Sequence, residues 1–305
     1  MAGTSPAMTE KTFTLAHLSD PHLAPLPRPM WRELAGKRAL GYINWRRNRH
    51  RVHRREVLDA LVADVHAQRP DHIAVTGDLT NIALPAEIDQ AAQWLRGIGA
   101  PTDVTLVPGN HDAYMRDSLP RTAAAWGDYM CGDVIAAHHG FPFVRRRDAL
   151  TLVGVSTAVP TAPFMATGEL GDAQRAALEQ TLYGLDAQNF RVLLIHHPLI
   201  SGDGRRHARL TDTDKLQDVL RRYPVDLVLH GHDHRHAITW VDGPTSPIPV
   251  VGVASASVAP GGHREAAAYN LFAIARADDG WRVTMTTRGM REDGTVAEVR
   301  RESLR

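Results

Sequence analysis

Short apolar runs alternate with stretches of helical spacing from the start of the chain to about residue 234. This alternation predicts an α/β fold built from packed layers. The apolar runs are short enough to be strands, and turn-forming or polar residues follow them. We predict six strands in this part of the chain: Phe13–Ser19, His72–Thr76, Asp103–Val107, Leu150–Val155, Val192–Ile195 and Asp226–Leu229.

The stretches between these runs have the spacing of amphipathic helices. In the first of them, Val57, Leu58, Leu61, Val62 and Val65 repeat with helical spacing. Proline suits the first turn of a helix, and aspartate suits the residue that caps its N-terminus. We predict helices over Val52–Gln68, Pro85–Leu95, Asp172–Tyr183 and Asp212–Tyr223, of which the second begins with Pro and the last two begin with Asp.

Beyond Arg235 the pattern changes to strands separated by turn signals such as Asp242-Gly243. We expect this tail to be an antiparallel extension of a second sheet. The prediction is therefore a single domain over residues 1–305, with a β-rich C-terminal extension at about residues 236–290. The tail strands are predicted over Ala237–Val241, Pro249–Val253, Tyr269–Ala275 and Trp281–Arg288.

The composition narrows the setting in which this domain works. The formal net charge is only +1, so no global field favours nucleic acid, and we expect no specific nucleic-acid binding. The single cysteine, Cys131, excludes an intramolecular disulfide and fits a reducing compartment. Residues 1–12 have no apolar core of signal-peptide length, and no run of eighteen apolar residues occurs. We therefore expect a cytoplasmic protein, and the oligomeric state stays open.

Five polar motifs follow the predicted strands of the first two thirds of the chain. Ligand groups converge at the carboxyl ends of strands in α/β sheets, so we expect these motifs to meet at the same edge. They bring carboxylates, imidazoles and one amide together. The motifs are Ser19-Asp20-Pro21-His22, Gly77-Asp78-Leu79, Gly109-Asn110-His111-Asp112, His196-His197-Pro198 and His230-Gly231-His232-Asp233-His234.

This set of side chains predicts a metal site. Histidine is frequent, with seventeen residues against six each of Trp, Tyr and Phe, and imidazole is a common ligand of transition metals. Carboxylates and imidazoles without a thiolate suit Mn, Fe or Zn ions. On an extended segment, Asp20 and His22 would point to the same side because strand side chains repeat every two residues, and His232 and His234 have the same spacing.

The five motifs, in this order, resemble the calcineurin-like metallophosphoesterase superfamily over Ala16 to His234. The resemblance implies a four-layer α-β-β-α sandwich of two mixed sheets flanked by helices. It also implies a dinuclear metal centre in which Asp78 bridges both ions, and a catalytic His111 that Asp112 orients. One metal would be held by Asp20, His22, Asp78 and His234, and the other by Asp78, Asn110, His196 and His232.

Each motif alone also has an ordinary structural interpretation, such as a turn or a polar loop, and only the five together point to metal. His196 and His197 compete for one ligand role. We favour His196 because it directly follows a predicted strand, and we expect His197 to line the pocket or to bond a backbone carbonyl. Asp233 should point away from the two histidines that flank it. The alternative of another class is a catalytically dead scaffold with the same fold.

Two cations close together would clamp phosphoryl oxygens and lower the pKa of a bridging water, which supplies hydroxide. His111 would then protonate the leaving oxygen as general acid. The chain thus resembles a phosphoesterase that uses two divalent or trivalent metal ions as cofactors. The chain looks most similar to the bacterial cyclic-nucleotide phosphodiesterase branch, so we expect a cyclic nucleotide or a similar small diester as substrate.

The segment 24–55 departs from a minimal member of the family. From Arg28 to Arg55 it holds ten Lys or Arg and a single acid, Glu33. It is interpreted either as a solvated hairpin that covers the core or as a basic, aromatic lid near the metals. The lid would attract a large anionic substrate or an anionic membrane surface, and it supports an alternative substrate, a membrane-derived phosphoester of the UDP-diacylglucosamine type. An apolar stripe is formed by Trp31, Leu34, Tyr42, Ile43 and Trp45, and Gly36 and Gly41 weaken any single long helix. A loop at 158–170 is a candidate substrate rim.

Overall fold

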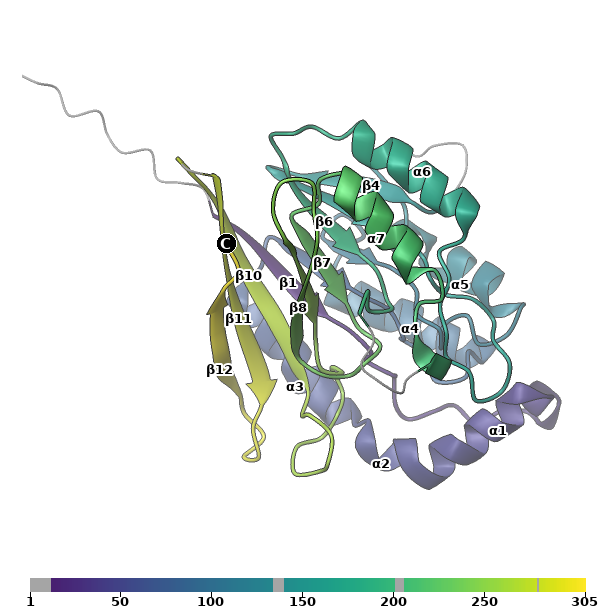
Figure 1. Ribbon diagram of the computed structural model, residues 1–305. Coiled ribbons are helices and arrows are strands. Elements are labelled where there is room, and N and C mark those ends of the chain that lie inside the picture. Colours follow the sequence, from purple (N-terminus) through teal and green to yellow (C-terminus); the bar gives the residue numbers. More distant parts are fainter. Residues whose placement is uncertain (1–11, 134–139, 201–205, 279) are drawn as a thin grey trace, which may run out of the picture.

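The computed structural model describes residues 12–133, 140–200, 206–278 and 280–305. Nearly all of the N-terminal stretch that lacks a signal-peptide core thus lies outside the described residues. Two six-stranded mixed sheets face each other, and helices cover their outer faces (Figure 1). This is the four-layer α-β-β-α sandwich that the resemblance implied. Among the described residues, no helix is both long enough and apolar enough to cross a bilayer.

The first sheet has the strand order β12-β11-β10-β1-β2-β3. The β1, β2 and β3 strands are parallel, whereas β10, β11 and β12 are antiparallel to their neighbours. Parallel neighbours end at the same edge, so the loops that follow β1, β2 and β3 lie side by side. The strands of this sheet are Phe13–Leu18 (β1), His72–Val75 (β2), Val104–Leu106 (β3), Ala268–Ala277 (β10), Gly280–Met290 (β11) and Val296–Ser303 (β12).

The second sheet has the order β4-β5-β6-β7-β9-β8, with β5, β6, β7 and β9 parallel. Its residues alternate between two cores, as the two-residue repeat of a strand requires. Val192 and Leu194 face the core between the sheets, whereas Leu193 and Ile195 face the core beneath the outer helices. The strands are Phe143–Arg147 (β4), Leu150–Gly154 (β5), Phe190–Leu194 (β6), Leu227–His230 (β7), Ala237–Val241 (β8) and Ile248–Gly252 (β9).

Helices α6 and α7 lie together on the outer face of the second sheet (Figure 1). On the first sheet, α3 is fixed by Asp64, which accepts hydrogen bonds from Tyr269 and Arg288 of the neighbouring strands. The α3, α4, α6 and α7 helices match the four predicted ones, and α5 was not predicted. These five helices are Arg55–Gln68 (α3), Pro85–Ile98 (α4), Ser118–Trp126 (α5), Asp172–Tyr183 (α6) and Thr213–Arg222 (α7). A 3₁₀ turn at Gly127–Tyr129 follows α5.

The aspartates that suited helix caps have other partners. Asp212 precedes α7, but its carboxylate accepts hydrogen bonds from the backbone amides of Leu170 and Gly171. Asp172 is the first residue inside α6 and pairs with Arg175 and Lys215, which links α6 to α7. These aspartates therefore join neighbouring segments instead of capping their own helices.

The prediction that the tail extends only a second sheet is wrong. β8 and β9 join the second sheet, but β10, β11 and β12 continue the first sheet from the free edge of β1. Strand patterns show which residues face a core, but they do not show which sheet edge a strand joins. The extension also reaches Ser303, beyond the predicted end near residue 290.

The segment 24–55 is helical and is not a hairpin. It contains the 3₁₀ turn Trp31–Leu34, the helix Lys37–Asn44 (α1), the π-helical turn Trp45–Arg49 and the short helix His50–Val52 (α2), which run along one end of the layers (Figure 1). Gly41 allows α1 to pack closely against Ile82 and Tyr114, because a Cβ at this position would clash with their side chains. Leu34, Tyr42 and Trp45 pack against a small apolar cluster, while Trp31 is 88% exposed. The buried members of that cluster are Leu26, Ile82, Ala83, Leu84 and Tyr114.

Candidate metal centre

Five strands deliver the five polar motifs to one end of the sandwich. Asp20, Asp78 and Asn110 follow β1, β2 and β3 of the first sheet, and His196 and His232 follow β6 and β7 of the second. The expectation that one sheet edge gathers all of them is therefore wrong in one respect. The site is shared between the carboxyl ends of two sheets, and its backbone segments are hydrogen-bonded across it, as from Ala256 N, after β9, to the carbonyl oxygen of Ser19, after β1 (2.9 Å).

All seven side chains that the sequence predicted as ligands come together. In each of two groups, one ligand atom per residue lies within 4.8 Å of all the others. Both groups contain Asp78, which is the position that a bridging ligand needs. Asn110 joins the second group, because its Oδ1 lies 3.2 Å from His196 Nε2 and 2.9 Å from His232 Nδ1. The groups are Asp20, His22, Asp78 and His234, and Asp78, His196 and His232. Their role as ligands stays a prediction.

The backbone at these residues is not extended, so the strand-repeat argument for Asp20 and His22 is wrong. Asp20 has φ 53° and His22 has φ 38°, and His232 and His234 have φ 69° and 54°. Asp78 also lies in the left-handed region, with φ 57°. Such a conformation costs a non-glycine residue roughly 1–2 kcal/mol, and structures retain it mainly at functional sites. Sharp turns after the strands, and not strand alternation, aim these side chains inward.

The glycines of the motifs allow the loops to pack closely. A Cβ at Gly109 would lie 2.6 Å from the backbone nitrogen of Asp78, a contact that no side-chain rotation relieves. A Cβ at Gly231 would overlap the Ser19 hydroxyl and the Asp20 carboxylate. The glycine before Asn110 and the glycine before His232 are thus required by the close approach of neighbouring strand ends.

Backbone carbonyls fix the orientation of three histidine rings. A carbonyl only accepts, so His22 Nδ1–H donates to Thr80 O (3.0 Å) and His196 Nδ1–H donates to Thr76 O (2.6 Å). In the same way His232 Nε2–H donates to Ala208 O (2.8 Å). The remaining ring nitrogen of each histidine faces the centre of the site, where most of the neighbouring side-chain atoms are acceptors, although His22 Nε2 also accepts from Arg49. A carbonyl partner on the second nitrogen is the usual arrangement of metal-binding histidines.

Asp20 shows the same excess of acceptors. Its Oδ1 is buried without a hydrogen-bond partner, although Oδ2 accepts from the backbone amide of His232 (3.0 Å). This Oδ1 lies 3.2 Å from His234 Nε2, which in turn lies 3.2 Å from His22 Nε2. Buried acceptors that face one another without enough protons are unfavourable unless a cation lies between them. The donor set therefore fits a pair of metal ions.

The electrostatics of the second group predict a proton-coupled metal affinity. Burial disfavours the charged form of His196, but the Asp78 carboxylate outweighs this effect and raises the His196 pKa to about 10. Without metal, this ring is thus protonated at neutral pH, and a cation must displace that proton. We expect metal affinity to rise by up to about tenfold per pH unit between about pH 6 and 8, with proton release. Calorimetric titration with Mn²⁺ in buffers of different ionisation enthalpy measures both the metal affinity and the number of protons released. An affinity that does not change with pH would contradict the predicted proton coupling.

His111 lies beside the two groups, but Asp112 does not orient its ring. The His111 Nδ1–H donates to the backbone oxygen of Asn81 (2.5 Å). The two carboxylate oxygens of Asp112 accept from the backbone amides of Asp78, Gly109 and Thr80. Asp112 is fully buried, so its carboxylate uses these nearby amides. The predicted orienting role of Asp112 is therefore wrong, and this residue joins the loops after β2 and β3.

His197 has partners of its own and leaves the ligand position to His196. Its Nδ1 is 2.7 Å from the Thr157 hydroxyl, and its Nε2–H donates to the backbone oxygen of Ala166 (3.1 Å). This agrees with the expectation that His197 bonds a backbone carbonyl. Ala166 belongs to the loop at 158–170, and it also lines the cavity above the site.

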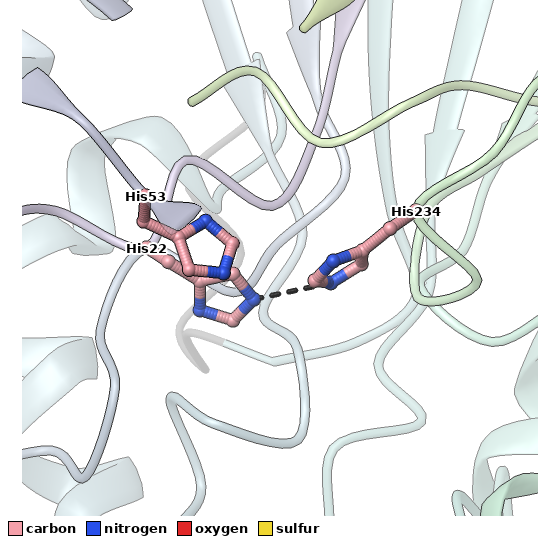
Figure 2. Close-up of side chains that lie close together, drawn as sticks. All are labelled: His22, His53 and His234. Carbon is pink, nitrogen blue, oxygen red and sulfur yellow. Dashed lines mark hydrogen bonds between the residues drawn. The ribbon is translucent and has the colours of Figure 1, made fainter. Parts of the chain in front are cut away.

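Two residues of the segment 24–55 reach the site, and sequence reasoning missed both. Arg49 donates from Nη2 to His22 Nε2 (3.2 Å) and from Nη1 to His111 Nε2 (3.1 Å). His53 lies against His22 and His234, with ring centroids 4.7 Å and 5.8 Å away (Figure 2). The only sequence signal was the basic run that contains them, and it could not single out either residue.

Arg38 fixes the segment to the loop that holds His111. This buried arginine donates to the backbone oxygens of Ile82 and Ala83. Glu87 of α4 accepts from the backbone amides on the other side of the same loop, including that of Asn81 (2.6 Å). The Asn81 carbonyl that holds the His111 ring is thus positioned by two charged side chains.

A cavity of about 660 Å³ opens above the two groups. Its floor includes Asp78, Asn110 and His232. Three arginines line its walls, Arg49, Arg235 and Arg264, together with the acidic residues Glu265 and Asp233. The histidines His111, His236 and His263 also line it, and burial lowers the pKa of the first two. This arrangement suits an anionic ligand larger than inorganic phosphate.

None of the curated proteins compared with this chain matches it. Among solved structures, the purple acid phosphatase PPD1 from yellow lupin (Lupinus luteus) seeds has a TM-score of 0.59 at 14% identity, covering 95% of this chain and 53% of that one. The Haemophilus influenzae NAD nucleotidase has a TM-score of 0.54 at 12% identity, covering 96% of this chain and 60% of that one. The chain thus spans little more than half of each, and at these identities the likeness shows the fold.

The model of the calcineurin-like phosphoesterase family matches residues 13–236, which is well over half of the 305 residues. The match begins at β1 and ends just after His234, so it includes all five motifs. It confirms the resemblance that the motifs indicated. The chain therefore belongs to the calcineurin-like phosphoesterase family.

Proposed function

We propose that this protein is a dinuclear-metal phosphodiesterase that acts on a cyclic nucleotide or a similar small diester. The observation that carries the proposal is the pair of ligand groups that share Asp78 at the floor of a basic cavity. Asp20, His22, Asp78 and His234 would hold one ion, and Asp78, Asn110, His196 and His232 the other. When bound, two such ions neutralise phosphoryl oxygens and lower the pKa of water, which supplies the nucleophile.

The side chains around the ions have separate tasks in this proposal. Arg49 lines the cavity beside Asp78, where its guanidinium can pair with phosphoryl oxygens. His111 faces the same space through Nε2, since its Nδ1–H is held by the Asn81 carbonyl. A proton on Nε2 would be given to the leaving oxygen, which is the general acid role. An arriving phosphate would also draw Arg49 away from His111 and so favour the protonated ring.

A small diester suits the cavity better than a polymer does. The volume of about 660 Å³ is within the range of pockets that hold small molecules, which is about 300–1,000 Å³. The arginines of the walls add charge for a phosphate, and Arg264 and His263 line the same cavity without belonging to either ligand group, so they are available to a second part of the substrate. The low net charge gives no support to extended nucleic acid. The single cysteine supports a cytoplasmic setting.

The test is an activity panel on metal-loaded protein. Protein reconstituted with Mn²⁺, Fe²⁺ or Zn²⁺ is assayed on a phosphomonoester, a simple diester, 3′,5′- and 2′,3′-cyclic nucleotides and UDP-diacylglucosamine. We expect the highest kcat/KM on a diester or cyclic nucleotide. A preference for the monoester would overturn the substrate proposal. Failure on every compound with two ions bound would favour a binding scaffold instead.

A second candidate, a membrane-derived phosphoester, is favoured by the outer surface of the segment 24–55. Met30, Trp31, Leu40 and Ile43 are exposed large apolar residues. Exposed arginines accompany them, among them Arg32, Arg46 and Arg47. Apolar side chains beside arginines suit the interface of an anionic bilayer, and the same segment carries Arg49 into the site. In this candidate the protein is cytoplasmic and binds peripherally at the inner membrane surface.

Vesicle sedimentation tests the second candidate. The protein should sediment with phosphatidylglycerol-containing vesicles at low salt, and less so at high salt or with phosphatidylcholine alone. The double variant Trp31→Ser, Ile43→Ser should lose this binding. Trp240→Ser is the matched control, because Trp240 is an exposed tryptophan on β8, outside the segment. Absence of salt-sensitive binding by the unaltered protein would overturn the membrane proposal.

A further inference from the structure

His53 is a buried histidine that belongs to none of the five motifs. It lies between α2 and α3, and its backbone is held on both sides. His53 N donates to the carbonyl oxygen of Arg49 (3.0 Å), and the next amide, of Arg54, donates to that of Ser257 (2.8 Å). A β-bridge also joins His53 to Val258. The residue is therefore fixed to a segment that is distant in sequence, and only 1% of it is exposed.

One ring nitrogen of His53 has a partner, and the other has none. Nδ1 lies 2.8 Å from the Ser257 hydroxyl, which can accept the Nδ1–H. Nε2 is buried without a hydrogen-bond partner. A buried polar atom in this state needs an explanation, because leaving it unpaired costs roughly 1–3 kcal/mol. His22 and His196 also donate from one nitrogen to a fixed oxygen and turn the other toward the site, where His22 Nε2 accepts from Arg49 and His196 Nε2 lies near Asp78. His53 differs in that its second nitrogen has no partner.

The position of His53 also suits a metal ligand. His22, His53 and His234 each offer a ring nitrogen, and these atoms lie within 4.8 Å of one another. Figure 2 shows the three rings gathered around one space, with His22 and His53 on one side and His234 opposite. Two of the three belong to the first ligand group, with Asp20 and Asp78. The His53 ring is thus beside a site where buried acceptor atoms outnumber the protons available to them.

We propose that His53 is an additional protein ligand of the ion held by Asp20, His22, Asp78 and His234. This rests on the proposed metal centre and goes beyond it, because the segment 24–55 would then supply part of the site. Three imidazoles would make this ion site richer in nitrogen than the second one. Imidazole favours Zn²⁺, Fe²⁺ or Co²⁺ over Mn²⁺, so His53 would bias the first position toward those ions. Arg49 would leave His22 Nε2 as the ion binds.

The experiment measures metal binding directly. The full chain, stripped of metal, is titrated with Co²⁺ against a competing chelator, and ¹H NMR of the loaded protein records the shifted N–H signals of cobalt-bound histidines. In His53→Gln, one of the two ions should bind about tenfold or more weakly, and one shifted N–H signal should disappear. The expected preference for Co²⁺ over Mn²⁺ at that position should also fall. His72→Gln is the matched control, because His72 is equally buried, contacts a hydroxyl through one ring nitrogen and leaves the other without a partner, but belongs to none of the groups of possible metal ligands among the described residues.

Two further outcomes separate the possible failures. If His53→Gln does not fold, Ser257→Ala tests the same inference, since loss of an orienting partner typically weakens metal binding by about 10–100-fold. Unchanged affinities and an unchanged set of shifted signals in both variants would overturn the role of His53, even with lower thermal stability. If the unaltered chain binds no metal at all, the proposed metal centre itself fails.

Discussion

Replacement of Asp78 by alanine is expected to abolish the binding of both metal ions and to reduce activity at least about 10³-fold. Asp78 is the one residue that the two ligand groups share. Its Oδ1 also accepts the backbone amide of His111 (2.7 Å), so the loop after β3 loses a contact at the same time. Two-metal sites stabilise the attacking and leaving oxygens together, so loss of both ions removes most of the catalytic effect.

Elemental analysis of the purified variant measures this loss. Asp78→Asn keeps the shape and one oxygen, and it should still lose most of the metal because the charge is gone. Asp59→Ala is a suitable control, since Asp59 pairs with Arg55 on the surface of α3. Two ions retained in Asp78→Ala would show that Asp78 is not the bridge.

Replacement of His111 by alanine is expected to keep both ions but to slow esters with poor leaving groups by about 10²–10⁴-fold. No member of the two ligand groups uses the His111 ring, which is held by the Asn81 carbonyl. A nitrophenolate leaves without protonation, whereas an alkoxide needs a proton, so a nitrophenyl ester should be affected far less. Rates on a matched pair of alkyl and nitrophenyl diesters check this, and equal losses on both would remove His111 from the acid role.

The pH profile gives a second test of the same role. Burial and the Arg49 guanidinium lower the pKa of His111 to about 4 in the free protein. An acid of this kind is protonated below its pKa, so activity on the alkyl diester should fall as the pH rises. Arg49→Met removes a neighbouring positive charge, which raises the His111 pKa and should shift that fall to higher pH. An unchanged profile would contradict the coupling between Arg49 and His111.

The sequence was sufficient to place the site because each motif directly follows a strand. Asp78 and Asn110 are two or more residues past β2 and β3, and parallel neighbours bring such positions together whatever the details of the loops. The apolar pattern therefore predicted an α/β layered fold with the polar motifs close together, whereas the four-layer arrangement and the ligand set came from the resemblance to the family. Similarly, the end of β6 singled out His196 correctly as the residue near Asp78 and Asn110.

The local backbone geometry and the contacts between distant parts of the chain could not be predicted from the sequence pattern. The positive φ angles of Asp20 and His22 depend on hydrogen bonds from their amides to Gly77 and Asp78, which sequence spacing does not show. The partners of Asp112 could not be predicted from spacing either. Its carboxylate is buried and accepts hydrogen bonds from backbone amides instead of bonding the neighbouring His111 ring. His53 meets Ser257 across 204 positions of the chain, so its place beside His22 follows only from the folded tail.

The division of the donors between the two sheets has a consequence for how the molecule melts. Ions bound there would tie the loops after β1, β2 and β3 to those after β6 and β7, so they would act as cross-links between the halves of the sandwich. Ligands that bind only the folded state raise its stability in proportion to the logarithm of their free concentration. Separation of the halves and release of the ions would then be one event, and chelation would loosen the whole scaffold.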